Sequence, residues 1–498
     1  MENISVILST SNFLQRRSPH IMTLKEKAQR AAALAVLEPL IKYVKKNPQD
    51  NLVKLVDAVQ RFAGTVFPEK NFDKFREAAT DPDNVYVQLL MRAINDLDPD
   101  IFNGMAMALG LGVAAGTKTV RENREKYHCN IPFITLIDPT SACNLKCKGC
   151  WSAEYGHKLR LTYEEMESIV EQGRELGTHL YMFTGGEPLI CKKEILKLCE
   201  KFPQCAFLAY TNATLVDQEF CNELKRVGNL ALAISIEGDE ESNDFRRGDG
   251  AYKTSIEAME LLKKNGCMFG ISVCYTSKNI YSVTSDEFLD DMISRGVMFG
   301  LYFNYMPLGK GAIPELIPDP EQRKYMYKRV RELRNSKSGK SMFIMDFQGD
   351  GEYVGGCIAG GRNYFHINSA GDIEPCVFIH FSDSNIRTHT LLEALQNPLF
   401  MSFYKNQPFN DNHMRPCPML ENPDYLCRIV KETGAKSTDL IDQESAEDLC
   451  AKCRKFAEEW APVAEEVWNS TPHKPSKTYY YRDTPEGKAE LEKKNSEN

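Results

Sequence analysis

The 498-residue sequence predicts an α/β fold: a partial (β/α)6 TIM-like barrel that follows an N-terminal helical domain and precedes a C-terminal cysteine-rich domain. Three observations predict this organisation. Apolar residues recur at helical spacing from about residue 23 to 125, six short apolar runs alternate with amphipathic segments between 131 and 310, and six cysteines lie between 357 and 453. Such alternation is typical of a parallel sheet with right-handed crossovers.

The N-terminal region divides into a poorly defined extension, residues 1–22, and a helical domain, residues 23–130. Within that domain, residues 101–115 are apolar and rich in Gly and Met. The stretch is shorter than the roughly 20 residues that a membrane-spanning helix needs. We expect a covered helix or the wall of a substrate channel, and the alternative is a helix that lies on a membrane surface.

The barrel is expected over residues 131–310. Its predicted strands are residues 133–137, 180–183, 206–210, 231–236, 269–275 and 299–305. The first helix should begin at Thr162, which forms a capping box with Glu165. Polar or glycine-rich turns follow the strands, and in barrels such turns meet on one face and carry the reacting groups.

Three segments complete the predicted organisation. Residues 311–345 should form a helical connector, residues 346–465 the cysteine-rich domain, and residues 466–498 a charged tail that is mostly mobile.

Composition narrows the class of partner and the compartment. A net charge of -8 and a pI near 5.8 give no basic field, so we expect no nucleic acid. We find no signal peptide, so the 16 cysteines are expected to be reduced, in the cytoplasm. The membrane alternative for residues 101–115 would add a peripheral contact with the inner membrane face.

Cys143, Cys147 and Cys150 form a tight triplet directly after the first predicted strand. Iron-sulfur clusters are normally held by four thiolates, so three leave one iron able to bind and activate a small molecule. The alternative is a zinc site, which prefers four ligands in two separated pairs. An open iron in a cytoplasmic protein implies chemistry that is sensitive to oxygen, and an anaerobic setting.

The triplet, the turn Thr-Gly-Gly-Glu-Pro188 and the six β/α units together resemble the radical S-adenosylmethionine (SAM) enzymes. The resemblance implies a 4Fe-4S cluster held by Cys143, Cys147 and Cys150. The cluster's open iron would chelate SAM and break it reductively to a 5'-deoxyadenosyl radical. Further positions match cofactor contacts of the family: Gly185, Gly186, Glu187, Pro188, Asn212, Ser235, Arg246 and Tyr305.

Two positions depart from the family pattern. The residue before the third cysteine is usually aromatic and here is Gly149, while the common Thr-Asn-Gly reads Thr-Asn-Ala213. Trp151 is a candidate for the missing ring.

The C-terminal cysteines resemble an auxiliary-cluster extension called SPASM. Cys357, Gly371 and Cys376 match its opening, but the usual dense central run of cysteines is replaced by a sparser set: Cys417, Cys427, Cys450 and Cys453. Six thiolates suffice for one closed cluster, or for two clusters with other ligands. The alternative is a zinc ribbon that includes Cys450 and Cys453.

The remaining chemistry-bearing residues receive no ligand role. Six cysteines fall within helix or strand patterns and are expected to be small buried apolar groups: Cys191, Cys199, Cys205, Cys221, Cys267 and Cys274. The histidines His366, His380 and His413 are expected to be merely hydrogen-bonded.

The predicted activity is hydrogen abstraction from an unactivated carbon of a peptide, a protein or a lipid. Residues 101–115 favour an alternative that acts on membrane-lipid chains, and we see no winged-helix module of the kind that grips leader peptides. A small donor such as ferredoxin or flavodoxin should supply electrons. A rival from another class is a non-enzymatic iron-sulfur electron carrier, which would bind no SAM.

Overall fold

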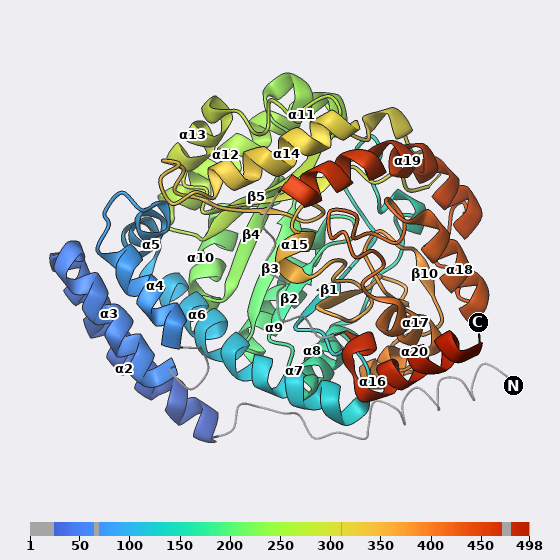
Figure 1. The fold of residues 1–498 in the computed structure, drawn as a ribbon. Coiled ribbons are helices and arrows are strands. Elements are labelled where there is room, and N and C mark those ends of the chain that lie inside the picture. Colours follow the sequence, from blue (N-terminus) through green and yellow to red (C-terminus); the bar gives the residue numbers. More distant parts are fainter. Residues whose placement is uncertain (1–23, 64–68, 310, 471–479, 498) are drawn as a thin grey trace, which may run out of the picture.

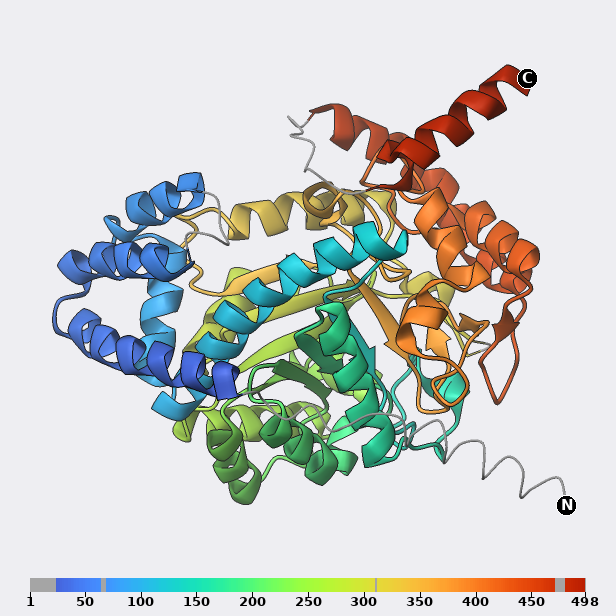
Figure 2. The ribbon, with the colours of Figure 1, turned by 90° about the horizontal axis from the view of Figure 1, so that it is seen from below.

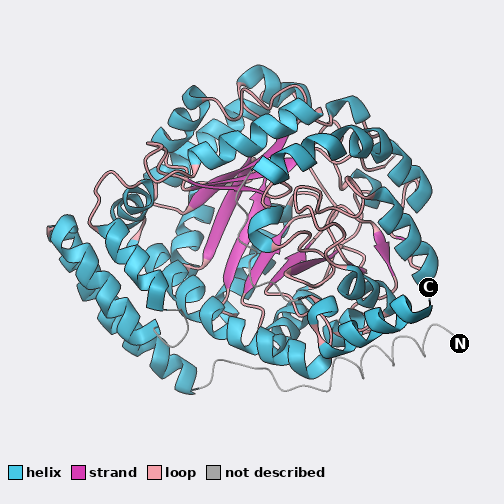
Figure 3. Ribbon diagram, in the orientation of Figure 1, coloured by secondary structure: helices cyan, strands magenta, loops and turns pink. Residues whose placement is uncertain are grey.

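The computed structural model describes residues 24–63, 69–309, 311–470 and 480–497, and the predicted extension 1–22 lies outside them. Parallel strands form the centre of the molecule, with helices around them (Figures 1 and 3). The six barrel strands are β1 (Ile134–Ile137), β2 (Leu180–Phe183), β3 (Ala206–Thr211), β4 (Leu230–Ser235), β5 (Phe269–Tyr275) and β6 (Phe299–Asn304). Each is parallel to the next, which confirms the predicted fold class.

The sheet is wider than the six strands that the sequence predicts. Its order is β7-β6-β5-β4-β3-β2-β1-β8-β9. β7 (Phe343–Asp346) lies parallel to β6, and β8 (Tyr364–Ile367) lies parallel to β1. β9 (Ile373–Glu374) returns antiparallel to β8. Residues 311–345 are therefore not only a helical connector, because they hold α14 (Pro320–Leu333) and most of β7.

Helices α8 to α13 connect the barrel strands and cover their outer face (Figures 1 and 3). They are α8 (Tyr163–Leu176), α9 (Lys192–Lys201), α10 (Gln218–Val227), α11 (Glu240–Arg247), α12 (Ala251–Lys264) and α13 (Asp286–Ser294). The predicted capping box is present: Thr162 Oγ1 accepts from Glu165 N, and Glu165 accepts from Thr162 N. These helices and the strands share one large apolar core.

The N-terminal region is helical, as predicted, and α6 and α7 run along the barrel in Figure 2. Its elements are α2 (Leu24–Lys46), α3 (Pro48–Ala63), α4 (Glu69–Ala79), α5 (Val85–Asp96), α6 (Pro99–Met107), a π-helical turn η1 (Ala108–Gly112) and α7 (Val113–Tyr127).

The apolar stretch 101–115 packs against the barrel through three glycines. A Cβ atom at Gly104, Gly112 or Gly116 would lie about 2.1 to 2.2 Å from a backbone carbonyl oxygen of residue 228, 204 or 177 respectively. Those three residues all lie just before strands, on the face opposite the carboxyl ends. The stretch therefore packs on the barrel as a covered helix would, away from the carboxyl ends of the strands, which does not support a substrate-channel wall. Leu109 is 42% exposed, and contact of this segment with a membrane surface stays a prediction.

The C-terminal region forms a second apolar core and is mostly helical. Its elements are α15 (Gly351–Val354), α16 (Leu391–Leu395), α17 (Pro398–Asn406), α18 (Pro423–Thr433), α19 (Ala446–Ser470) and the two-stranded pair β10 (Phe381–Ser382) and β11 (Lys436–Ser437).

The segment predicted as a mobile tail, 466–498, has structure in its described parts. Helix α19 continues to Ser470, and residues 485–497 form α20 (Pro485–Glu497). The Tyr480 hydroxyl donates to Gly355 O at 2.6 Å, which ties this segment to the C-terminal region.

None of the helices within the described ranges has both the length and the apolar run needed to cross a membrane.

Candidate active site

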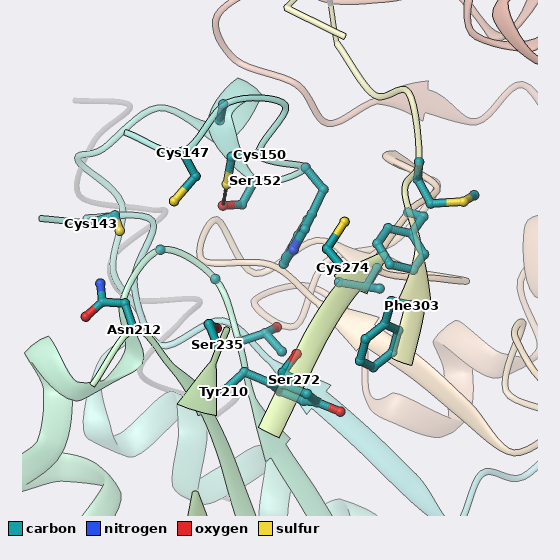
Figure 4. Close-up of a pocket in the computed structure, with 18 of the residues that line it drawn as sticks. Cys143, Cys147, Cys150, Ser152, Tyr210, Asn212, Ser235, Ser272, Cys274 and Phe303 are labelled. Atoms are coloured by element: carbon teal, nitrogen blue, oxygen red, sulfur yellow. Dashed lines mark hydrogen bonds between the residues drawn. The ribbon is translucent and has the colours of Figure 1, made fainter. Parts of the chain in front are cut away.

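A cavity of about 380 Å³ lies at the carboxyl ends of the barrel strands. Residues of β1 to β6 and of the loops after them line one part of it, and residues of β7, β8 and the segments around them line another. Figure 4 shows the three triplet cysteines at one end, Phe303 at the other and Cys274 between them. The volume lies within the range of small-molecule sites, and the position is where barrels place their chemistry.

Cys143, Cys147 and Cys150 all line this cavity from the loop after β1. Burial, with smaller contributions from Glu187 and the neighbouring thiols, raises the pKa of Cys143 to about 11. Burial likewise raises the pKa of Cys147, while Arg247 opposes the shift. Metal coordination would reverse this effect, since iron binds the thiolate.

Among the described residues, no three Cys, His, Asp or Glu side chains lie close enough together to share one metal ion. A four-iron cluster accepts thiolates that are further apart than the ligands of one ion, because each thiolate binds a different iron.

The glycine turn after β2 is held against the cysteine loop by backbone hydrogen bonds. Gly186 N donates to Thr140 O at 2.9 Å, and Glu187 N donates to Ala142 O at 2.8 Å. A Cβ atom at Gly186 would lie 2.1 Å from Ala142 O, so only glycine permits this approach. An ammonium group donates hydrogen bonds, so the turn could bind one only through its carbonyl oxygens.

Glu187 is 1% exposed, lines the cavity and joins the loops after β2 and β3. Its carboxylate accepts from Thr211 Oγ1 at 2.7 Å, from Asn212 N at 2.8 Å and from Leu189 N at 3.0 Å. A carboxylate offers about four acceptor positions, so one remains for a further donor. This fits the amino group of SAM. Pro188 is buried in the turn and is not part of the cavity lining.

Two arginines share one buried carboxylate beside the cysteines. Arg246 Nη1 lies 2.5 Å and Arg247 Nη2 2.6 Å from Glu237 Oε1, and Glu237 is fully buried. The group carries one excess positive charge, which favours an anion nearby. Within the described residues, Arg246 Nε is buried without a hydrogen-bond partner. An unpaired buried donor is costly, so it indicates a place for a ligand acceptor.

Tyr305 explains the absent aromatic residue before the third cysteine. A Cβ atom at Gly149 would lie 2.6 Å from the Tyr305 ring and hydroxyl, so the ring occupies the space of a side chain at 149. The Tyr305 hydroxyl accepts from Ile313 N at 2.9 Å, and the residue is 1% exposed. A ring thus reaches the same place from β6. Trp151 also lines the cavity.

Ala213, which stands where the family commonly has glycine, differs in its backbone conformation from most alanines. Ala213 adopts a φ of 63°, a left-handed conformation that glycine takes more easily. Asn212, beside it, lines the cavity, and its side chain donates to Asn144 Oδ1 of the cysteine loop at 2.8 Å. Ser235 lines the cavity from the end of β4.

The cavity continues from the cysteine end into an apolar part that the sequence did not reveal. This part contains no charged side chain. Its lining is Ile134, Leu136, Met182, Tyr210, Phe303, Met306, Met345, Phe347, Ile358, Tyr364, Val377 and Phe378. Six of these come from β7, β8 and the segments around them, which the sequence did not predict to join the barrel.

Cys274 was expected to be a buried apolar group, but it lines the cavity. It lies on β5 two residues after Ser272, and Figure 4 shows both side chains in the cavity. Burial raises the pKa of its thiol to about 11. The alternation of inward residues along β5 was the signal that could have found it.

His366 is another residue that the sequence left without a role. It is fully buried on β8, where its Nδ1 lies 2.6 Å from Glu374 Oε2 and its Nε2 lies 3.0 Å from Asp138 Oδ1. Burial lowers its pKa, but the two carboxylates outweigh burial and raise it to about 10. Trp151 packs edge-on against the imidazole at 5.8 Å. The buried imidazole therefore supports the cysteine loop through its contact with Trp151, the residue after Cys150.

The C-terminal cysteines divide into two groups of three. Cys357, Cys376 and Cys417 line a small second cavity of about 40 Å³, and Tyr364 and Phe378 separate it from the main one. Cys427 lies on α18, and Cys450 and Cys453 lie on α19. Burial raises the pKa of Cys450, and the neighbouring thiol of Cys427 also raises it. Of the other predicted buried cysteines, Cys191, Cys199, Cys205, Cys221 and Cys267 are buried.

Comparison with known proteins gives a consistent picture of the barrel. Residues 137–292 match the family model of the Radical SAM superfamily. An uncharacterized protein of Archaeoglobus fulgidus is 28% identical over 282 residues, 51% of this chain and 64% of that protein, so less than two thirds of it is covered. The AdoMet-dependent heme synthase of Methanosarcina barkeri is 22% identical over 295 residues, 54% of this chain and 83% of that enzyme.

Among solved structures, Streptococcus suis SuiB bound to the precursor peptide SuiA aligns with a TM-score of 0.51. The alignment has 18% sequence identity and covers 67% of this chain and 80% of that chain. At this identity the likeness shows a shared fold.

Proposed function

The chain belongs to the radical SAM superfamily through residues 137–292, and on that premise we propose that it abstracts a hydrogen atom from a hydrocarbon part of its substrate. The observation that carries the proposal is one continuous cavity with three thiols at one end and an uncharged apolar lining at the other.

The family implies a 4Fe-4S cluster and SAM, and a reduced cluster supplies the electron that cleaves SAM to a 5'-deoxyadenosyl radical. Cys143, Cys147 and Cys150 would hold the cluster. The Gly185–Gly186 carbonyls and Glu187 would bind the ammonium group of SAM. Arg246 would meet an acceptor of SAM through its unpaired Nε, and Asn212 and Ser235 would contact polar groups of the nucleoside. Tyr305 would pack on the adenine.

The apolar part of the cavity favours a substrate whose reacting part is a hydrocarbon chain. Methionine and aromatic side chains dominate this lining, and they also keep water from the reacting carbon. A buried amide or carboxylate would lose its hydration there without a charged partner in return. We therefore propose a lipid chain as the substrate class, on the evidence of the cavity and not of residues 101–115.

Two other substrate classes are outcomes of the test. A peptide, as bound by SuiB, would place backbone amides in the uncharged lining unless only a side chain entered. A tetrapyrrole, the class that the name heme synthase implies, carries carboxylates that require cations. The lining's charged residues, Lys146, Glu187, Arg246 and Arg247, all belong to the cysteine end.

We also propose at least one auxiliary iron-sulfur cluster, held by Cys357, Cys376 and Cys417. Three thiols around one small cavity next to the main one support this assignment. Cys427, Cys450 and Cys453 would be ligands of a second metal group. A one-electron donor such as ferredoxin or flavodoxin would reduce the enzyme.

The experiment is anaerobic incubation of reconstituted, reduced enzyme with SAM and one of three additions: membrane lipids, a peptide digest or coproporphyrin. We expect 5'-deoxyadenosine to rise above the substrate-free background with lipids, with a matching mass change in a lipid product. A rise only with peptides or porphyrin would replace the proposed substrate class. Absence of 5'-deoxyadenosine under all conditions, with the cluster intact, would favour the electron-carrier alternative.

A further inference from the structure

Cys274 lies between the two ends of the cavity. In Figure 4 its sulfur faces the cavity between the triplet cysteines and Phe303. β5 pairs Cys274 with Phe303 of the apolar lining, while Arg246 is close enough to act on the charge of its thiolate. The thiol therefore lies at the junction between the cysteine end of the cavity and its apolar part.

The chemistry of a thiol at this place differs from that of every other lining group. A sulfur–hydrogen bond is weaker than the bond of an unactivated carbon to hydrogen, so transfer of hydrogen from a thiol to a carbon radical is downhill. Hydroxyl groups such as those of Ser235 and Ser272 hold their hydrogen more strongly than carbon does. An ordinary thiol remains protonated at neutral pH, so the hydrogen is present.

An independent observation marks the same space as a ligand site. Among the described residues, Arg246 Nε is a buried donor without a partner, and the Arg246 side chain is 10% exposed. Arg246 and Cys274 both line the cavity, and Arg246 Nη1 and the backbone N of Cys274 donate to the two carboxylate oxygens of Glu237. A ligand that accepts from Arg246 Nε would therefore lie near Cys274.

We propose that Cys274 is a catalytic hydrogen-atom donor, a role that rests on the proposed radical function. The sulfur–hydrogen bond of Cys274 breaks, a carbon–hydrogen bond forms on the carbon radical, and a thiyl radical remains on Cys274. One electron from the low-potential donor that reduces the cluster, together with one proton from solvent, restores the thiol. Reactions of this class return a hydrogen to the substrate from the protein.

The test uses the substrate-free reaction, so it needs no knowledge of the substrate. Reconstituted enzyme is reduced with dithionite in D2O, without thiol reductants, and mass spectrometry measures deuterium in the 5'-deoxyadenosine formed from SAM. Exchange places deuterium on the Cys274 sulfur. We expect deuterium per product in Cys274→Ala and Cys274→Ser to fall about tenfold, because removing a positioned donor removes its proximity advantage.

Cys267→Ala is the matched control, since Cys267 is buried just before β5 and does not line the cavity. It should retain the wild-type deuterium content. The serine variant preserves the size of the side chain, and circular dichroism verifies its fold. Equal deuterium in all four proteins would overturn the proposal for Cys274 alone, whereas absence of 5'-deoxyadenosine in the wild type would overturn the proposed function.

A second readout does not depend on turnover. S-adenosylhomocysteine, an unreactive analogue of SAM, should slow alkylation of Cys274 by N-ethylmaleimide in the unreduced holoenzyme, as measured by peptide mass spectrometry. An unchanged alkylation rate, with binding of the analogue verified by calorimetry, would place Cys274 away from the cofactor and contradict the role.

Discussion

The ring of Tyr305 occupies the space that a side chain at position 149 would need. A side chain at 149 would meet the Tyr305 ring at 2.6 Å, and the φ of Gly149 is 61°. Gly149→Ala therefore adds a collision to left-handed strain, and we expect a loss of about 2 to 4 kcal/mol in the free energy of unfolding, measured by denaturant titration.

Gly434→Ala is the control for that substitution. Gly434 has a φ of 68°, and nothing lies within 4 Å of the position of its Cβ atom, so only the conformational strain remains. Its loss should be about 1 kcal/mol. Equal losses in the two variants would show that Tyr305 does not occupy the space next to residue 149.

His366 links the barrel to the C-terminal region through two buried carboxylates. Its folded pKa, about 10, exceeds the ordinary value near 6.5. The ion pair's contribution to stability is therefore complete below about pH 6.5 and is lost as the pH rises to about 10. Denaturant titrations across this range should show stability falling with pH.

The same measurements on His366→Gln provide the contrast. Removing the imidazolium leaves Asp138 and Glu374 buried without a cation, and we expect a loss of about 3 to 5 kcal/mol at pH 7. The pH dependence of stability between 6.5 and 10 should flatten. A variant that retains the wild-type slope would assign the dependence to other groups.

At this scale the sequence predicted the cysteine end of the cavity better than its apolar part. Cys143, Cys147, Cys150 and seven of the eight predicted cofactor positions line one cavity, because each lies at the end of a strand or in the loop or helix that follows one, and these segments converge. Cys274 and His366 were missed, since a cysteine or histidine in a strand gives no sign of whether it faces a cavity or packed side chains.

Helix α6 and the turn after it lie on the barrel through glycines, so their substitution tests the packing. Gly104→Ala places a methyl group 2.1 Å from a backbone oxygen that cannot move independently, and we expect a loss of about 1 to 3 kcal/mol in unfolding free energy. The measurement is chemical denaturation of the full chain.

Gly110 offers the matched comparison in the same segment. Nothing lies within 4 Å of its Cβ position, so Gly110→Ala should be neutral or stabilising by up to about 1 kcal/mol. If both substitutions were equally tolerated, the close contact between this helix and the barrel would be absent in solution.

The elements that the sequence did not predict are short. β7, β8 and β9 have four, four and two residues, and a run of three apolar residues such as Phe343-Ile-Met345 is too short to show a period. The barrel strands were predicted within one or two residues, because each apolar run alternates with an amphipathic helix and the first of these helices has a capping signal at Thr162. Pairing of β8 with β1 depends on contacts more than 200 residues apart, which local pattern does not encode.

At the scale of the whole molecule, two groups of thiols line two adjoining cavities, and iron content can distinguish the groups. Replacing Cys357, Cys376 and Cys417 together by Ala should remove about four irons per chain from the reconstituted protein, if they hold one four-iron cluster. The cluster proposed for Cys143, Cys147 and Cys150 should remain, and its electron paramagnetic resonance spectrum should still change when SAM is added. Iron and sulfide analysis with electron paramagnetic resonance makes the measurement.

The matched comparison replaces Cys143, Cys147 and Cys150 by Ala. That protein should keep the auxiliary iron and lose all cleavage of SAM. Unchanged iron content after the first triple substitution would exclude Cys357, Cys376 and Cys417 as ligands and direct attention to Cys427, Cys450 and Cys453.

β8 is the parallel neighbour of β1, the strand that leads directly into the cysteine triplet. A chain that ended after residue 345 would leave the β8-facing edge of β1 without hydrogen-bond partners over its four residues. Such an exposed strand edge promotes self-association. The residues after 345 thus complete the sheet on the β1 side, and Tyr364 of β8 forms part of the cavity wall. Expression of the two parts as separate polypeptides should yield aggregates that become soluble only when both are made together.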